Sequence, residues 1–561
     1  MVTRAGRLEG LGGVRAGRGR RGTGWPGRLG TTLRHGLGLA AGALVDSVRR
    51  RRQGHPPATG LSFTVARVAA AAVRPWLDPQ LAAAPFPVQL RLRLEMLGPV
   101  YIKLGQVLSL RTDLLPEAVT SELRNLLDRL PAAPWEAIEP VIEADLGGPV
   151  QRFFRWVDPD PMGSASIAQI HRAVTRQGDD VVLKVVKPEI PGLLRQDAVL
   201  LRAAARLLDR VLPAYRPREI VEEFLESTRR ELDMGREAAN AETFAAAFEG
   251  FPGVVFPEVH RHCSGPRVLC LQWIDGIRPD SPEAASIPLA ERRKLIDTGA
   301  AVIVQMLYRD GFFHADLHPA NVLIVRREEG YGLAFLDLGM VGRLEARVRR
   351  LMLYYFYSVV QGDFENAARY LASVARRGPD ADTAGFRKEM EDISRRWRGA
   401  ETVREYSLAQ LILQSIQSGA RYRMYFPVEM VLMVRALVTY EGIGMLLDPG
   451  LNVARITRRH VTEQFRRQMN PFRLAREGLR RAPDLMDAII TLPTLVTEGM
   501  ELLEQRREPA GRGLDPAARA IYGGSCLLAG AVLAAASAPW PAWALLLGAG
   551  IVLPLTGRRK K

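Results

Sequence analysis

The sequence has 561 residues, too many for one ordinary domain, and its 47% hydrophobic and 25% charged residues indicate a globular chain. Its three cysteines stand in no metal-ligand spacing, which excludes a disulfide scaffold and argues against a structural zinc site. Of the net charge of +16, residues 1–55 carry +10 and residues 558–561 carry +4. A near-neutral body with two basic ends argues against a nucleic-acid-binding domain and fits ends that lie at an anionic membrane surface.

Lysine is rare in this chain, which has seven Lys against seventy Arg. A lysine that is kept in such a composition indicates a need for a compact ammonium where a planar guanidinium would not serve. The interior lysines are Lys103, Lys184, Lys187, Lys294 and Lys388. Lys294 and Lys388 have acidic neighbours on expected helices and are predicted to be surface residues.

The N-terminal residues 1–59 are rich in Gly and Arg with little periodicity, so we expect a disordered basic arm. A transit peptide and a misassigned start codon remain alternatives, although Ser47 is the only serine before residue 60. Residues 60–145 follow, and their apolar residues at helical spacing predict a helical extension.

The next segments change from strands to helices. Residues 146–280 contain apolar, β-branched runs bounded by Pro, Gly and Asp, which predict a sheet. Residues 281–505 are mainly helical, with two short strands expected around VLIV and LAFLDLG.

The C-terminal part begins with a predicted linker at residues 506–519. Residues 520–557 then hold two uncharged apolar stretches separated by Pro539-Trp540-Pro541, which predict two transmembrane helices in a hairpin. A hydrophobic hairpin buried in the soluble fold is the alternative. The four basic residues at the end favour a tail on the cytoplasmic side.

Two motifs carry the strongest chemical signal. The segment HADLHPAN (residues 314–321) sets Asp316 and Asn321 five apart, and a hydrophobic run leads into Asp337-Leu-Gly, 21 residues after Asp316. Phosphoryl transfer needs one Asp at the attacking hydroxyl, and an Asn and a second Asp on Mg²⁺. A helix cap and an ordinary strand end would explain either motif alone, but both in this order favour phosphoryl transfer.

Lys184 stands in the middle of the apolar run VVLKVV. Because lysine is rarely buried unpaired, this pattern favours a lysine that holds ATP phosphates over an edge-strand lysine facing solvent. Its partner is expected in the following acidic segment, where Asp233 and Glu237 are four apart on one helix face and Glu231 points elsewhere. Lys187 is expected to be a solvated strand end.

A glycine-rich G-x-G-x-x-G loop is missing before Lys184. In its place stand Gly163, Ser164, Ala165 and Ser166, whose small side chains still let backbone N–H groups approach phosphates. Ala and Ser restrict the backbone more than Gly, so nucleotide position and selectivity are expected to differ from those of an ordinary kinase.

The order of these motifs resembles the UbiB/ADCK (AarF) family of atypical protein-kinase-like proteins, over residues 85–455. The segment KLGQ (103–106) is similar to the family's K-x-G-Q motif, and residues 163–166 to its Ala-rich loop. Glu231-Leu-Asp233 is similar to its E-x-D motif, and the two motifs above to its catalytic loop and metal-binding triplet. The acidic pair Glu231 and Asp233 is the candidate partner of Lys103. Gly163, Leu317 and Ala320 depart from the family pattern, which usually has Ala, Pro and Gly there.

The resemblance implies an α+β, two-lobed protein-kinase-like fold with an N-terminal helical extension over the active site and the C-terminal transmembrane hairpin. Residues 146–280 would form the smaller lobe and residues 281–505 the larger, helical lobe. It also implies roles for particular residues. The implied residues are catalytic Asp316, Lys184 and Glu237; nucleotide-binding Gly163, Ser164, Ala165, Ser166 and Lys184; metal-binding Asn321 and Asp337; and regulatory Lys103, Gln106, Glu231 and Asp233.

The implied function is that of a membrane-anchored atypical kinase or ATPase that binds ATP and Mg²⁺ and supports the biosynthesis of ubiquinone or other isoprenoid quinones and lipids. The expected partners are a membrane lipid or quinone precursor and quinone-biosynthesis enzymes, not nucleic acid; a homodimer stays open. The expected location is the bacterial inner membrane, with the catalytic body on the cytoplasmic side. A non-catalytic, nucleotide-responsive scaffold is the alternative, and the missing glycine loop and the Lys103 extension disfavour a Ser/Thr protein kinase.

Overall fold

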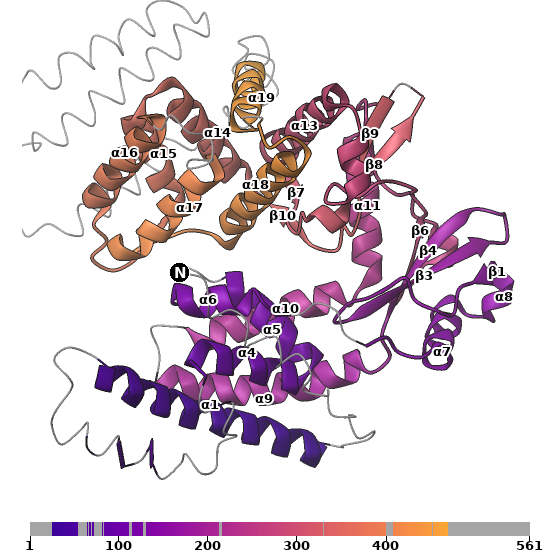
Figure 1. The fold of residues 1–561 in the computed structure, drawn as a ribbon, viewed down its shortest axis with the longest axis horizontal. Helices are drawn as coiled ribbons and strands as arrows, with labels where there is room; N and C mark the ends of the chain where they lie inside the picture. The colour runs from indigo at the N-terminus through magenta and orange to yellow at the C-terminus, as the bar shows by residue number, and fades with distance from the viewer. Residues whose placement is uncertain are drawn as a thin grey trace, which may run out of the picture. The chain divides into compact units, whose positions relative to one another are not determined.

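The computed structural model describes residues 25–468, apart from 54–63, 65–66, 69, 72–80, 82–83, 111–114, 127–130, 212–215, 329, 400–407 and 451–452. Figure 1 shows the arrangement of the described helices and strands. The predicted linker and the predicted transmembrane hairpin lie outside the described residues, so both stay predictions.

The smaller lobe is built on an antiparallel sheet. Strands β1 (Phe154–Val157), β3 (Ala168–Thr175), β4 (Asp180–Val186) and β6 (Val268–Gln272) follow in this order, and β2 (Gly163–Ser164) pairs with β3. Burial alternates along β3, as expected of a strand with one face toward the core. These are the segments in which β-branched runs predicted strands.

Helix α7 (Trp135–Leu146) covers one face of this sheet. Its Ile138 and Ile142 are fully buried and pack with residues of β4 and β6, among them Leu183 and Cys270. The short helix α8 (Val150–Phe153) then leads into β1. The predicted extension ended at residue 145, but α7 packs with the smaller lobe because its apolar stripe matches the sheet.

The helical extension is assembled from separate parts of the chain. Helices α4 (Phe86–Leu97), α5 (Pro99–Leu110) and α6 (Glu117–Leu123) share a core with α9 (Ile190–Val211) and α10 (Pro217–Glu231). The last two were predicted to belong to the smaller lobe. They carry strongly amphipathic faces that α4–α6 cover, and this pairing between distant segments leaves no local signal.

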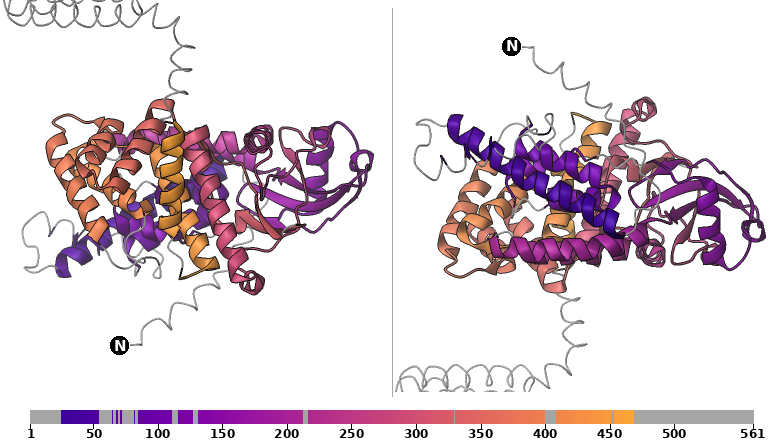
Figure 2. Two further views of the ribbon diagram at one scale, coloured as in Figure 1. Left: turned by 90° about the horizontal axis from the view of Figure 1, so that it is seen from above. Right: turned by 90° about the horizontal axis from the view of Figure 1, so that it is seen from below.

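Helix α1 (Trp25–Gln53) corrects the prediction of a disordered arm at 1–59; the remaining residues of that arm lie outside the described part. It lies against α4 and α9 (Figure 2). A Cβ at Gly38 would collide with the Arg93 guanidinium, and one at Gly42 with the Gln89 side chain. These two glycines therefore leave room for side chains of α4 where α1 lies against it.

The larger lobe has one continuous apolar core. Strands β8 (Val322–Arg327) and β9 (Gly330–Phe335) are the two that the sequence predicted, and they pair as a hairpin with the short β5 (Val254–Val255) parallel to β9. The elements after α10 are α11 (Met234–Ala247), β5 (Val254–Val255), α12 (Pro282–Ser286), α13 (Leu289–Val304), β7 (Phe312–His314), β8 (Val322–Arg327), β9 (Gly330–Phe335), β10 (Val341–Arg343), α14 (Ala346–Gln361), α15 (Phe364–Val374), β11 (Arg376–Arg377), α16 (Thr383–Gly399), α17 (Leu408–Gly419), β12 (Met424–Tyr425), α18 (Val428–Leu447) and α19 (Val453–Gln468).

Candidate active site

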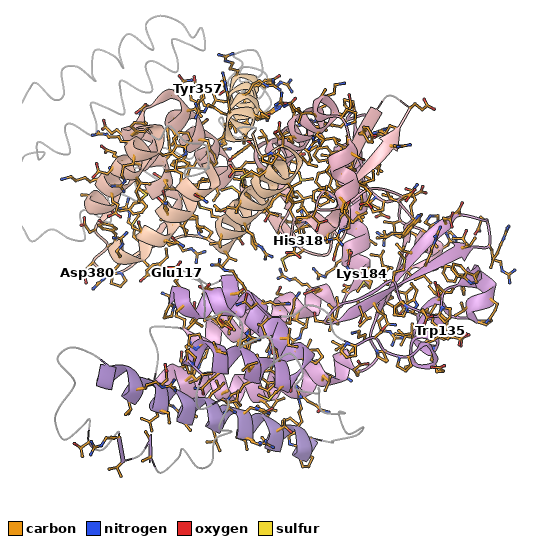
Figure 3. The ribbon with its side chains drawn as sticks, in the orientation of Figure 1. Glu117, Trp135, Lys184, His318, Tyr357 and Asp380 are labelled. Carbon is orange, nitrogen blue, oxygen red and sulfur yellow. The ribbon has the colours of Figure 1, made fainter. Side chains whose placement is uncertain are left out.

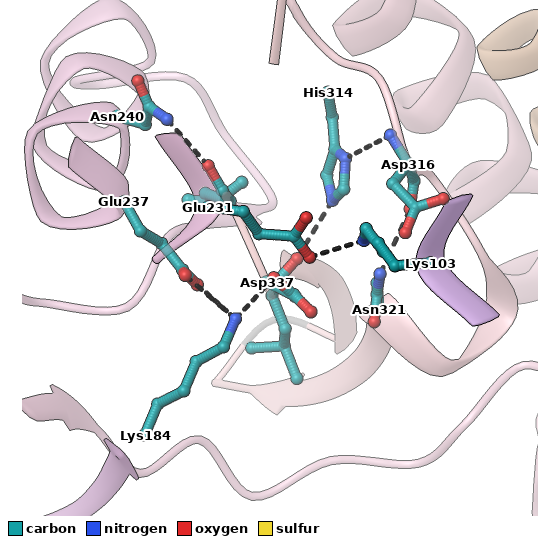
Figure 4. Close-up of polar contacts among 11 residues, drawn as sticks. Lys103, Lys184, Glu231, Glu237, Asn240, His314, Asp316, Asn321 and Asp337 are labelled. Carbon is teal, nitrogen blue, oxygen red and sulfur yellow. Dashed lines mark hydrogen bonds and ion pairs between the residues drawn. The ribbon is translucent and has the colours of Figure 1, made fainter. Parts of the chain in front are cut away.

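Lys184 lies at the centre of the candidate site. It stands in β4 between Ile170 of β3 and Leu269 of β6. Its Nζ lies 2.9 Å from both carboxylate oxygens of Glu237 and 2.8 Å from Oδ1 of Asp337. Figure 4 shows the ammonium between the two carboxylates, and Figure 3 shows Lys184 on the sheet side and His318 on the helical side.

Burial and charge act against each other in this cluster. Burial lowers the pKa of Lys184, but the carboxylates of Asp337 and Glu237 outweigh it and raise that pKa above its usual value. Burial raises the pKa of Glu237 to about 7 although Lys184 opposes the shift. For Asp337 the Lys184 ammonium outweighs burial and lowers the pKa to about 2. Asp337 is therefore ionised at neutral pH, as a cation ligand must be.

The helix that carries Glu237 begins later than the sequence predicted. Helix α10 ends at Glu231, and α11 begins at Met234 after a break. Asp233 caps α11, accepting a bond from the Gly235 amide at 3.1 Å. The expectation that Asp233 and Glu237 share a helix face is thus wrong, because a cap has non-helical backbone angles.

The predicted catalytic loop, residues 314–321, begins at the end of β7, and His314 fixes its start. The His314 ring is buried, with Nε2 3.0 Å from the Leu336 carbonyl and Nδ1 3.3 Å from the amide of Asp316. A carbonyl only accepts and an amide only donates, so Nε2 carries the proton and Nδ1 is bare. Burial lowers the pKa of His314, which agrees with a neutral ring.

Asp316 and Asn321 lie on this loop beside Asp337. The Asn321 amide nitrogen donates to the Asp316 carbonyl at 3.1 Å, which leaves Asn321 Oδ1 facing away from that bond. Asp337 has a left-handed backbone, with φ of 49°, a conformation that is uncommon for residues other than glycine and that Asp adopts more readily than most.

The oxygens of this site fit Mg²⁺ on a nucleotide. Mg²⁺ prefers oxygen ligands and is usually held by one or two carboxylates together with substrate phosphates. Asp337 commits Oδ1 to Lys184, and Asn321 commits its nitrogen, so each keeps an oxygen for a cation. Within the described residues no group of three or more His, Cys, Asp or Glu could hold a metal by itself. These two oxygens therefore fit a metal ion that is also bound by the phosphates of the nucleotide.

Arg435 of α18 was missed by the sequence analysis. Its Nη2 lies 2.8 Å from Oδ1 of Asp316, and both side chains are 38% exposed. The two residues are 119 positions apart. Arginine is the commonest charged residue of this chain, so no composition signal could have singled it out.

Lys187 fixes the backbone of the loop formed by Gly163, Ser164, Ala165 and Ser166. This lysine is only 2% exposed, and its Nζ donates to the carbonyls of Ala165 at 2.8 Å and Pro131 at 3.0 Å. The expectation of a solvated strand end is therefore wrong. Burial lowers the pKa of Lys187.

Lys103 reaches the site from α5 in the extension. Its Nζ lies 2.6 Å from Oε1 of Glu231, and its charge also contributes to the lowered pKa of Asp337. Gln106 is three residues further along the same helix. Of the two acidic candidates for contact with Lys103, Glu231 makes it, while Asp233 pairs with Arg236 at 3.3 Å.

Comparison with known proteins agrees with these features. The ABC1 atypical kinase-like domain matches residues 125–371, and the UbiB helical domain matches residues 396–452. A "Probable protein kinase UbiB" from Azotobacter vinelandii is 32% identical over 510 residues, covering 86% of this chain and 91% of that protein. Another protein of that name, from Pseudomonas entomophila, is 31% identical over 495 residues, covering 85% and 91%. The chain belongs to the UbiB family of ABC1 atypical kinase-like proteins.

A solved structure gives a weaker likeness. It is described as a complex of Rv3197 from Mycobacterium tuberculosis with erythromycin, and is 23% identical with a TM-score of 0.44, covering 61% of this chain and 87% of that one. A likeness at this level says nothing of ligands.

The UbiB helical domain holds Arg435, because α18 lies within it. By length and composition α18 is also the one helix of the described residues that could cross a membrane. More than half of its most apolar window is buried, and Met430, Met433 and Val434 belong to the core of the larger lobe. These contacts are those of a core helix of the UbiB fold.

Proposed function

We propose that this UbiB-family protein binds Mg²⁺ and ATP between its two lobes and transfers or hydrolyses the γ-phosphoryl group. The carrying observation is Lys184, which lies between Glu237 and Asp337 at 2.8–2.9 Å. A lysine in this setting supports phosphate binding, and the free oxygens of Asp337 and Asn321 support a metal on the phosphates. Asp316 would accept the proton of the attacking hydroxyl or water.

We further propose that the reaction supports ubiquinone or another isoprenoid-quinone or lipid pathway at the cytoplasmic face of a bacterial inner membrane. The UbiB-named relatives support the pathway, and the two apolar C-terminal segments with basic ends support the membrane. The acceptor would be a lipid or quinone precursor, and quinone-biosynthesis enzymes would be its protein partners.

The decisive experiment is Asp337→Asn in the full-length protein, with Asp392→Asn on the exposed face of α16 as the matched control. Calorimetry measures ATP affinity with and without Mg²⁺. Loss of one anionic ligand should weaken Mg²⁺-dependent binding at least about tenfold, while the control binds as the wild type does. Unchanged affinity in a folded Asp337→Asn protein would show that the metal assignment is wrong.

A nucleotide-responsive scaffold without turnover is the second candidate. The contact of Lys103 with Glu231, which joins the extension to the site, is the observation that favours it. Turnover with and without liposomes that carry a quinone-precursor mimic separates the two functions. ATP binding without any phosphate release would favour the scaffold.

A further inference from the structure

Asp316, the carboxylate proposed to face the phosphoryl acceptor, has a cationic partner from a distant helix. Arg435 Nη2 of α18 lies 2.8 Å from its Oδ1. Among the described residues the other oxygen of Asp316 makes no hydrogen bond, so it remains free for an acceptor. The pair is partly exposed, 38% on each side, so the guanidinium is at the surface of the site rather than locked in the core.

The loop itself supplies no cation beside Asp316. His318, two residues further on, is exposed, and its Nδ1 accepts a bond from the Ala320 amide at 3.2 Å within the same loop. Lys184 forms ion pairs with two carboxylates, and Lys103 forms one with Glu231. Of the cations in the described part of the site, Arg435 is the one bonded to Asp316.

Phosphoryl transfer needs positive charge where the group moves. An acceptor oxygen forms a bond to the γ-phosphorus while the bond from that phosphorus to the β–γ bridging oxygen breaks. The acceptor proton passes to the carboxylate, and the electron pair leaves with ADP. Negative charge on the phosphoryl oxygens must be stabilised throughout, and a cation aimed at them is typically worth 10²- to 10³-fold or more in rate.

We propose that Arg435 supplies this charge, as an arginine that the UbiB helical domain contributes to the phosphoryl-transfer site. The inference rests on the proposed function and goes beyond it by giving the helical domain a catalytic residue. A guanidinium offers a planar fork of donors that matches phosphate oxygens, and its bond to Asp316 keeps it at the acceptor side of the site.

The test compares Arg435→Met and Arg435→Lys with a control, Arg421→Met. The control removes an exposed arginine that also lies in the UbiB helical domain. In full-length protein, Arg435→Met should lower kcat about 10²- to 10³-fold with KM for ATP within about threefold, and Arg435→Lys should restore part of it. The control should match the wild type in both constants. Thermal unfolding identifies any variant that is not folded.

A second readout does not depend on turnover. ADP with Mg²⁺ and aluminium fluoride mimics the transferring group, whereas ADP alone does not. Arg435→Met should weaken binding of the mimic at least about tenfold and leave ADP affinity unchanged, since the lost contact is made to the transferring group. Equal loss for both ligands would show that Arg435 is structural and would overturn the inference.

Two outcomes separate this inference from the function on which it rests. Wild-type protein that neither binds nor turns over ATP would overturn the proposed function itself. Wild-type turnover with an unchanged kcat in folded Arg435→Met and Arg435→Lys would overturn only the role of Arg435.

Discussion

The Lys103 ammonium lies 2.6 Å from Oε1 of Glu231, which joins the helical extension to the end of α10 beside the candidate active site. The two side chains are 12% and 25% exposed, and Oε2 of Glu231 is buried with no hydrogen-bond partner in the described part of the chain. This carboxylate therefore depends on Lys103. The next helix, α11, carries Glu237, the partner of Lys184.

Replacing Lys103 by Met should loosen the extension. Loss of one partner of a buried ion pair costs about 3–5 kcal/mol, and the partial exposure here favours the lower end. We expect a lower melting temperature and a changed rate of ATP turnover, both measured on full-length protein. Lys388→Met, on the exposed part of α16, should change neither. Identical behaviour of the two variants would make Lys103 an ordinary surface lysine.

Replacing Lys187 by Met should weaken nucleotide binding. The substitution keeps the bulk of the side chain but leaves the carbonyls of Ala165 and Pro131 without a charged donor, a loss of about 1.5–3 kcal/mol per bond. The loop at 163–166 then loses its fixed position, and we expect an affinity for ATP at least about tenfold lower by calorimetry. Lys294→Met is the control, since Lys294 is 73% exposed. Equal affinities of both variants would contradict this role.

His171 should make stability fall at acid pH. Its Nδ1 donates to the Asp158 carbonyl at 2.8 Å, so its bare Nε2 accepts from the Gln169 amide at 2.9 Å. Burial lowers the pKa of His171 below 6.5. As the pH falls, the unfolded chain therefore binds a proton at this ring before the folded chain does. The contribution of His171 to the free energy of unfolding is fully present above about pH 7 and declines as the pH falls below about 6.5.

Between pH 7 and pH 5 the melting temperature of the His171→Gln variant should therefore fall less than that of the wild type. The difference is bounded at about 1.4 kcal/mol per pH unit for one proton. Some decline should remain, because burial also lowers the pKa of His314. His262→Gln, an exposed residue, is the control. A wild-type slope in His171→Gln would argue that another group titrates.

Removing Arg28 should detach α1. Its Nε lies 2.7 Å from Oδ1 of Asp197 on α9, and that carboxylate is fully buried. Burial raises the pKa of Asp197 and Arg28 opposes the shift. In Arg28→Met the unpaired carboxylate should raise hydrogen exchange along α1 at least about tenfold, more at high pH, where its charge is costly. Arg34→Met, on the exposed side of α1, should leave the exchange rates unchanged.

Local patterns determined much of the site. The spacing of Asp316, Asn321 and Asp337, and the lysine within an apolar strand, could be found in the sequence because each motif lies on one loop or strand. Strands β3, β4, β8 and β9 were predictable for the same reason, since alternation and β-branched runs are properties of neighbouring residues. The UbiB resemblance followed from the order of these motifs.

The tertiary structure alone decided the contacts between distant segments. Arg435 and Asp316 are 119 positions apart, so no periodicity links them. For Lys103 the sequence offered two candidate partners, Glu231 and Asp233, and the fold decided between them. The prediction that Lys187 is solvated was wrong, because the burial of a strand end depends on which distant segments pack over it. The glycines of α1 gave a composition typical of disorder, yet they lie in a helix, where Gly38 and Gly42 leave room for the Arg93 and Gln89 side chains of α4. Composition reports local preference, whereas packing against a distant partner supplies the free energy that decides the fold.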